Sequence, residues 1–421
     1  MKESILHYIW QQKLFQPHSL FTTDGEQVEV IDVGKHNTDA GPDFFNSKIK
    51  IGETIWAGNV EIHSNSSDWI KHNHHTNNAY NNIILHVVKV ADTEVYRADG
   101  ERIPQLILKY PAHIEDNYNR LITEKKWIPC ADKINLVPEI FIQSWKNALL
   151  SERLEQKMNA IVLLLNENNQ HWEEAFYITL ARSFGFGTNS QALEMLAKSL
   201  PLNALAKHKN NLFQIEALLF GQAGFLNESL NDAYFQQLKK EYDFLKAKFD
   251  LQSMEVNLWK LLRLRPDNFP QIRIAQFAAL IHSSTKLFSR IIEQPEIEKL
   301  TRLFKTEPSE YWKTHYLFGH ESKNKSKKLG KESIHSLLIN TVIPFLFCYA
   351  YQRGYQELLD KVIQLLENIP AEKNVIIQEW RNLGMKIESA YDSQAFLQLK
   401  KLYCDDKNCL RCRIGHKVLT S

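Results

Sequence analysis

"GPDFFNSKIKIGETIWAGNVEIHSNSSDW", from Gly41 to Trp69, decides the fold class of this chain. It contains two runs of alternating or β-branched residues, "NSKIKIGE" and "TIWAGNVEIH", and it opens on a Gly-Pro pair. Such runs predict two neighbouring strands, and the Gly-Pro pair predicts a turn ahead of them. Asp43 stands just before the first strand and Glu61 lies inside the second. If the strands form a hairpin, the two acidic side chains converge at one edge of the sheet.

The flanking segments extend this pattern to a recognisable order of elements. Residues 1 to about 16 repeat apolar positions at a helical spacing. "EQVEVIDVG" and "NNIILHVVKV" predict further strands, and "SSDWIKHNHHTNNAYN" predicts a short helix before the last strand. The predicted order is helix, three strands, helix, strand. "EVYRADGERIPQLIL" adds a hairpin around Asp99-Gly100.

The remainder of the chain has a different character. From about Pro138 to Asp392 the amphipathic pattern is almost entirely helical. We therefore expect an α+β protein with a mixed sheet in its N-terminal αβββαβ core, then a large all-α domain and a short Cys-rich tail. The predicted boundaries are 1–130, 138–400 and 401–421.

The composition limits the classes of partner. The chain has 421 residues, 44% of them hydrophobic, and a net charge of only +2, so no global field draws it to nucleic acid or to an anionic membrane. The N-terminus is too polar for a signal peptide, and no apolar stretch reaches the ~18 residues of a spanning helix. We expect a cytoplasmic protein. The lysine-rich segment 319–333 is expected to be a mobile, solvated loop, with a phosphate-contacting arm as the alternative.

The acid pair predicts chemistry with a divalent cation. Two carboxylates on adjacent strands can share one Mg²⁺ or Mn²⁺, and a neighbouring polar group can orient the attacking water. Glu61 and His63 are two residues apart, hence on one face of their strand. Asp43, Glu61 and His63 are accordingly the candidate catalytic residues, with Asp43 and Glu61 as metal ligands. The alternative is a turn capped by Asp43 and a strand with half-exposed polar residues.

This arrangement resembles the PD-(D/E)xK nuclease superfamily over roughly residues 1–95. Pro42-Asp43 matches its PD, and Glu61-Ile62-His63 matches its (D/E)xK with histidine in place of lysine. The resemblance implies a nuclease-like core and a metal-dependent nuclease, in which Glu3 of the first helix could add a carboxylate. The missing lysine leaves three roles open for His63: general base, metal ligand, or mark of an inactive site.

Histidines are concentrated in the same region. Eight of the sixteen fall within the first 86 residues, and "HNHH" supplies His72, His74 and His75. On a helix His72 and His75 would share a face. We take His72 and His86 as candidate ligands that would suit a softer ion such as Mn²⁺ or Zn²⁺, and phosphate binding is the other functional role open to these histidines. The alternative is a core histidine at position 86 and a solvated turn at 72–75.

The last 18 residues predict a second metal site. Cys404, Cys409, Cys412 and His416 follow the pattern C-x4-C-x2-C-x3-H. Cys130, in "WIPC", competes with His416 as the fourth ligand. Zinc suits either set, and an all-cysteine set also suits an iron–sulfur cluster. The alternative is free thiols in a polar tail.

The stretches "GPDF", "GNVEIHSNSSDWIKHNHH", "AYNNIILHVV", "FGQAG", "RLRPDNFP" and "CLRC" are similar to a bacterial family of unknown function (number 2851), typical of Bacteroidota. That resemblance implies no activity. The leading hypothesis is a metal-dependent nuclease or phosphodiesterase whose helical half binds nucleic acid or a protein. The rival is a non-catalytic module that binds nucleic acid or protein on the same scaffold, and a histidine-bound Zn²⁺ hydrolase is the third. The pattern leaves open any oligomer and the choice between DNA and RNA.

Overall fold

A computed structural model describes residues 3–284 and 286–421. The chain divides into two compact units. The first comprises residues 1–145 together with 399–421, and the second comprises residues 146–398. The first unit carries the mixed sheet and the second is almost wholly helical, so the predicted α+β class is confirmed.

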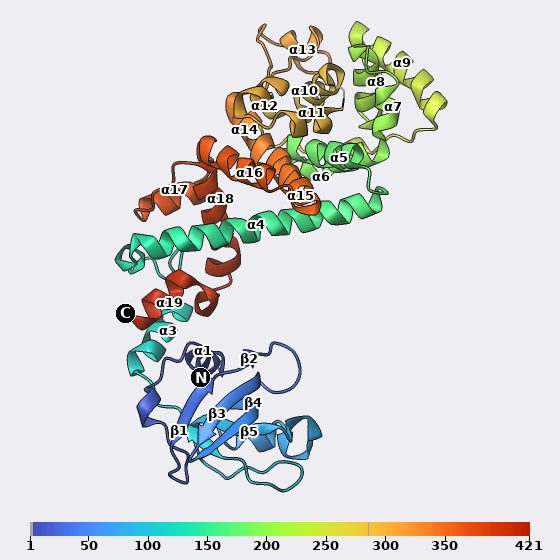
Figure 1. The fold of residues 1–421 in the computed structure, drawn as a ribbon. Helices are drawn as coiled ribbons and strands as arrows, with labels where there is room; N and C mark the ends of the chain where they lie inside the picture. The colour runs from blue at the N-terminus through green and yellow to red at the C-terminus, as the bar shows by residue number, and fades with distance from the viewer. Residues whose placement is uncertain (1–2, 285) are drawn as a thin grey trace. The chain divides into compact units, whose positions relative to one another are not determined.

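The sheet of the first unit is mixed (Figure 1). Its strands follow the order β1-β3-β4-β5-β6, and the short β2 pairs with β3. β1, β3 and β4 are antiparallel neighbours, whereas β4, β5 and β6 run parallel. The elements are α1 (Glu3–Gln11), β1 (Val28–Asp32), β2 (Lys35–His36), β3 (Phe44–Ile51), β4 (Thr54–Asn65), α2 (Asp68–Lys71), β5 (Ile83–Val90) and β6 (Gln105–Ile107). The predicted helix, three strands, helix and strand are all present in that order.

Burial explains why these segments adopt these conformations. In α1 the apolar residues Ile5, Leu6, Ile9 and Trp10 are fully buried, which fixes the helix by its apolar face. β5 is buried along its first six residues, as expected for an interior strand with parallel partners. His86 lies inside that run and is the polar exception.

The loop before β3 positions its first residues. Gly41 has a φ of +111°, a conformation that favours glycine. Asn37 braces the same loop, because its Nδ2 donates to the carbonyl oxygens of Asp39 and Pro42 at 3.0 and 3.1 Å. Its backbone N–H also donates to the Asp43 carbonyl at 2.7 Å. The backbone of Asp43 is thus held from both sides.

Residues 399–421 return to the N-terminal unit. They form η8 (Lys400–Cys404), η9 (Cys409–Arg411) and α19 (Arg413–Thr420), and α19 packs beside α3 (Ala112–Thr123) (Figure 1). Asn117 of α3 donates through Nδ2 to the carbonyl oxygens of Leu419 and Ser421, both at 3.2 Å. The tail is therefore part of the packed structure around α3.

The second unit has one large apolar core. Its elements are most of α4 (Glu139–Glu167), then α5 (Trp172–Phe184), α6 (Ser190–Ser199), α7 (Leu202–Ala206), α8 (Leu212–Gln222), α9 (Ala233–Phe249), α10 (Pro270–Ser283), α11 (Leu287–Glu293), α12 (Ile297–Leu303), α13 (Tyr311–Thr314), β7 (His315–Leu317), β8 (His320–Glu321), α14 (Lys331–Leu337), α15 (Ile343–Arg353), α16 (Gln356–Asn368), α17 (Val375–Asn382) and α18 (Ala390–Leu399). The β7-β8 hairpin was not predicted, because its strands are only three and two residues long.

The lysine-rich segment 319–333 is mostly exposed, and residues 322–330 are irregular, as expected of a solvated loop, but some of its lysines have partners. Lys327 is 3% exposed, and its Nζ donates to the carbonyl oxygens of Trp312 and Lys313 at 2.5 and 2.9 Å. Lys325 pairs with Asp267 at 2.8 Å and Lys328 with Glu307 at 3.3 Å. These three lysines are paired or hydrogen-bonded within their own unit.

One continuous helical run, Lys331–Arg353, is long and apolar enough to cross a membrane by length and composition. Its most apolar window is 67% buried within the protein. The run includes the buried Cys348 and belongs to the core of the helical unit.

Candidate metal centre

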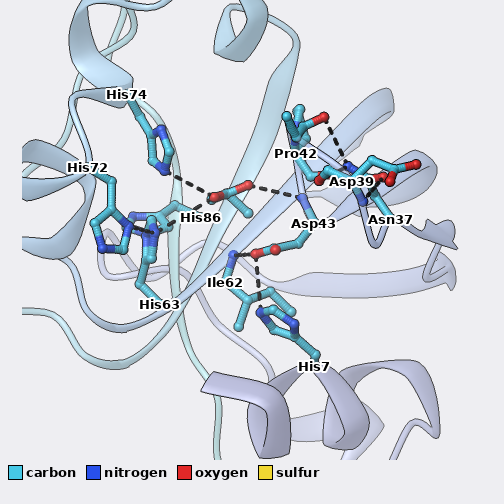
Figure 2. A network of polar contacts seen from close by, with 12 residues as sticks. His7, Asn37, Asp39, Pro42, Asp43, Ile62, His63, His72, His74 and His86 are labelled. Carbon is cyan, nitrogen blue, oxygen red and sulfur yellow. Dashed lines mark hydrogen bonds and ion pairs between the residues drawn. The ribbon is translucent and has the colours of Figure 1, made fainter. Parts of the chain in front are cut away.

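The two predicted acids meet between the inner strands β3 and β4. Phe44 pairs with Val60 in the antiparallel register, which places Asp43 opposite Glu61. The Asp43 backbone N–H donates to Glu61 Oε2 at 3.1 Å. In return, Asp43 Oδ2 accepts from the Ile62 N–H at 2.9 Å (Figure 2). The acids come together on interior strands, at the beginning of β3. The Glu61 carboxyl is held by the backbone of Asp43, and the Asp43 carboxyl is held by the backbone of Ile62, the residue after Glu61.

A histidine that the sequence did not single out joins Asp43. His7 Nε2 of α1 lies 3.3 Å from Asp43 Oδ2, and the two side chains are 19% and 21% exposed (Figure 2). Burial lowers the pKa of His7, but the hydrogen bond and the negative charge of Asp43 outweigh it, so the pKa is raised. Glu3, one turn earlier on α1, raises it further by its charge. Residue spacing gives no signal for this pair, because it depends on the packing of α1 against β4.

Glu61 is the most buried acid of the site, at 4% exposure. Its Oε1 lies 3.2 Å from His74 Nε2 and 3.7 Å from His63 Nε2. Burial, followed by the negative charge of Asp43, raises the pKa of Glu61 to about 9. A buried carboxyl of this kind stays protonated at neutral pH unless a cation offsets its charge.

Three imidazoles gather beside Glu61, and two of them, those of His63 and His74, face its Oε1. The ligand atoms of His63, His72 and His74 all lie within 4.8 Å of one another. His63 Nε2 is 3.1 Å from His72 Nδ1, and the rings of His63 and His74 stack at 5.4 Å (Figure 2). Burial, then the neighbouring histidines, lowers the pKa of His63 to about 2. His63 is therefore neutral, which is the form that binds a metal.

The turn in "HNHH" brings His72 and His74 together. Asn73 has a φ of +61°, in the left-handed region, so α2 ends there instead of continuing. The helical spacing that would pair His72 with His75 is broken, and His74 enters the site in place of His75. His74 is held by stacking on Tyr80 at 3.8 Å between ring centroids and by an edge contact with Trp69. The sequence missed His74 as a ligand because the deciding torsion lies at Asn73.

His86 occupies a second layer of the site. It pairs with Glu61 in the parallel register of β4 and β5, and its Nε2 lies 2.9 Å from His63 Nδ1. Burial lowers the pKa of His86 to about 3. His86 contacts His63 from behind, and an imidazole in this position fixes the tautomer and the orientation of the ligand in front of it.

The arrangement offers one grouped set of three imidazole ligands, from His63, His72 and His74, and Glu61 Oε1 lies beside two of them, His63 and His74. His72 is exposed while the other three residues are buried, so the site opens to solvent on one side. One carboxylate and three imidazoles suit Mn²⁺, Fe²⁺ or Zn²⁺ better than Mg²⁺, which prefers oxygen ligands. Asp43 and His7 stand beside this set as a partly exposed ion pair.

The predicted cysteine ligands gather elsewhere in the N-terminal unit. Cys409 and Cys412 are each 7% exposed, and all five cysteines of the chain are free thiols. Burial raises the pKa of four thiols, those of Cys130, Cys404, Cys409 and Cys412. The charge of Cys412 raises the pKa of each of the other three thiols further. The four thiols are therefore close neighbours. His416 faces another way, since its Nδ1 lies 2.6 Å from Tyr8 Oη of α1.

The comparisons with known proteins identify a family. The family model described as "Protein of unknown function (DUF2851)" matches residues 3–375, and the chain belongs to this family. No curated protein matches the chain. No solved structure matches it either.

Proposed function

We propose that this member of the DUF2851 family is a metal-dependent hydrolase that cleaves phosphodiester bonds in nucleic acid. The observation that carries the proposal is the position of Glu61. One oxygen of its buried carboxyl accepts from the backbone of Asp43, and the other faces His63 and His74. The acid pair and the histidine triad thereby form one site.

Each side chain of the site has a distinct role in the proposed hydrolysis. Glu61, His63, His72 and His74 hold a divalent ion, with Mn²⁺ favoured over Mg²⁺ by the imidazoles. When bound there, such an ion would supply a coordinated water of lowered pKa and positive charge beside the phosphate. His63 acts as a ligand and not as a base, because both of its ring nitrogens already face other histidines. Asp43, paired with His7, accepts the proton of the attacking water, since this pair is adjacent and partly exposed.

Nucleic acid is proposed as the substrate because the order of elements and the positions of Asp43 and Glu61 resemble the PD-(D/E)xK superfamily. The rival function is a module that binds nucleic acid or a protein without cutting. A cytoplasmic location fits either function and is part of the proposal.

The test is hydrolysis of labelled single- and double-stranded DNA and RNA with Mn²⁺, Zn²⁺ or Mg²⁺, and with a chelator. Glu61→Gln keeps the size of the side chain and removes its charge. His75→Ala is the matched control, since His75 comes from the same segment but is not among the grouped ligands. We expect cleavage by the wild type and by His75→Ala, with loss of at least about 100-fold in Glu61→Gln.

Equal cleavage by the wild type and Glu61→Gln would contradict the proposal. A chain that retards the labelled strands in a mobility assay without cutting them, with each metal, would favour the binding module.

A further inference from the structure

The cysteine cluster is independent of the proposed hydrolase site and supports a separate inference. We infer that Cys130, Cys404, Cys409 and Cys412 together ligate an iron–sulfur cluster. The cluster would join the segment after α3 to the C-terminal tail within the N-terminal unit. Four thiolates are the ligand set that such clusters use in proteins.

The backbone brings the four residues together from distant parts of the sequence. η9, which begins at Cys409, packs against α3 and α19, and Cys130 follows α3 by a few residues. Lys407 fixes this approach, because its Nζ donates to the carbonyl oxygens of Ile122 and Glu124 at 2.6 and 2.8 Å. Cys130 also lines a cavity of about 100 Å³ that Val418 of α19 borders.

Tight packing in the tail also keeps η9 and α19 close together. A Cβ at position 415 would lie 2.2 Å from the Cys409 carbonyl oxygen, so only glycine allows η9 and α19 to approach this closely. The backbone N–H groups of Ile414 and Gly415 are directed at the sulfur of Cys412. A neutral thiol is a weak acceptor, whereas a cluster-bound thiolate is stabilised by such donors.

The spacing of the sulfurs selects the cluster over a single zinc ion. Across the described residues, which include all five cysteines, the group that brings three ligand atoms within 4.8 Å of one another is His63, His72 and His74. No three of the cysteine sulfurs therefore lie within 4.8 Å of one another. Around one zinc ion, with Zn–S bonds of about 2.3 Å, tetrahedral geometry places the sulfurs only about 3.8 Å apart. In an iron–sulfur cluster the cysteines bind several iron atoms instead of one ion, so their sulfurs can lie further apart than around a single zinc ion.

The fourth ligand is Cys130 and not His416. His416 Nδ1 is engaged by Tyr8 at 2.6 Å, and His416 lies one turn beyond Cys412 on α19. Cys130, by contrast, shares its electrostatic environment with Cys409 and Cys412. The all-cysteine set is complete without the histidine.

The experiment is metal and sulfide analysis of the full-length chain purified without oxygen. We expect iron and acid-labile sulfide in similar amounts, with visible charge-transfer absorption. Cys130→Ser and Cys412→Ser should each lose most of the iron. Cys348→Ser, in the core of the helical unit, and His416→Ala should keep it.

Analysis of the wild type decides the matter even if the cysteine variants do not fold. One zinc per chain without sulfide would overturn the inference, as would four thiols that react freely with an alkylating reagent in a metal-free chain. Iron lost from His416→Ala but kept in Cys130→Ser would also overturn it. None of these readouts depends on hydrolysis, so this inference and the proposed function can fail separately.

Discussion

Glu61 is the residue on which the hydrolase site depends, and its burial has a measurable consequence. The pKa of its carboxyl is raised from 4.5 to about 9, first by burial and then by Asp43. A raised pKa means that the folded state binds the proton more tightly than the unfolded state. The stability that this provides is complete below pH 4.5 and is lost as the pH rises towards about 9.

Without metal, we therefore expect the melting temperature of the wild type to fall between pH 5 and pH 9. Glu61→Gln should show a smaller fall, because its neutral amide does not titrate. Added Mn²⁺ should raise the wild-type melting temperature most at high pH. The measurement is thermal unfolding across this pH range in the presence of a chelator. A steeper fall in Glu61→Gln than in the wild type would contradict the assignment.

His86 provides a second test at a single side chain. It contacts His63 through a ring nitrogen at 2.9 Å and stands behind the ligand set. Removal of such a partner usually costs about 10–100-fold in metal affinity. We expect His86→Phe to weaken Mn²⁺ binding by this factor in calorimetric titration. His75→Ala is the control, and an unchanged affinity in His86→Phe would rule out the second-layer role.

Among the elements, the short segment from α2 to β5 determines which histidines meet. The alternation of β3 and β4 predicts both strands and the pairing of Asp43 with Glu61, because period-two patterns are local. His74 and His7 escape prediction for different reasons. His74 depends on one left-handed residue, Asn73, and His7 depends on how α1 packs on the sheet. Neither the torsion at Asn73 nor the packing of α1 can be predicted from the spacing of residues in the sequence.

Asn73→Ala tests the turn. Asparagine tolerates the left-handed conformation, whereas alanine there costs about 1–2 kcal/mol. We expect Asn73→Ala to lower both stability and Mn²⁺ affinity, and Asn73→Gly to retain them. Thermal unfolding and metal titration of the two variants give the comparison. Equal behaviour of the alanine and glycine variants would show that the turn does not position His74.

For the molecule as a whole, the sequence predicts the order of the parts better than their association. The change from strand periodicity to helix periodicity near position 138 is visible, and the sheet and the helical region follow it. That residues 399–421 pack with residues 1–145 is not visible, because the contacts join positions about 300 apart, as in Asn117 with Leu419. The ion pairs of the lysine-rich segment escape prediction for the same reason, since the partners Asp267 and Glu307 are remote in sequence.

Removal of the tail should accordingly destabilise the sheet-containing unit. Ile414, Val418 and Leu419 are at most 3% exposed. Leu419→Ala alone should cost about 2–5 kcal/mol, as for other buried leucines. Denaturant unfolding of this variant, beside the surface change Arg411→Ala, measures the effect. A loss no greater than that of Arg411→Ala would mean that the tail packs only loosely.

The central claim is that Glu61 and three histidines hold one divalent ion. A crystal of the full-length chain soaked in Mn²⁺ and measured at a wavelength where manganese scatters anomalously tests this most directly. We predict an anomalous peak at bonding distance from Glu61 Oε1, His63 Nε2, His72 Nδ1 and His74 Nε2, and none there in Glu61→Gln. A wild-type crystal with no peak between these four atoms, while Mn²⁺ is bound elsewhere on the chain, would contradict the account.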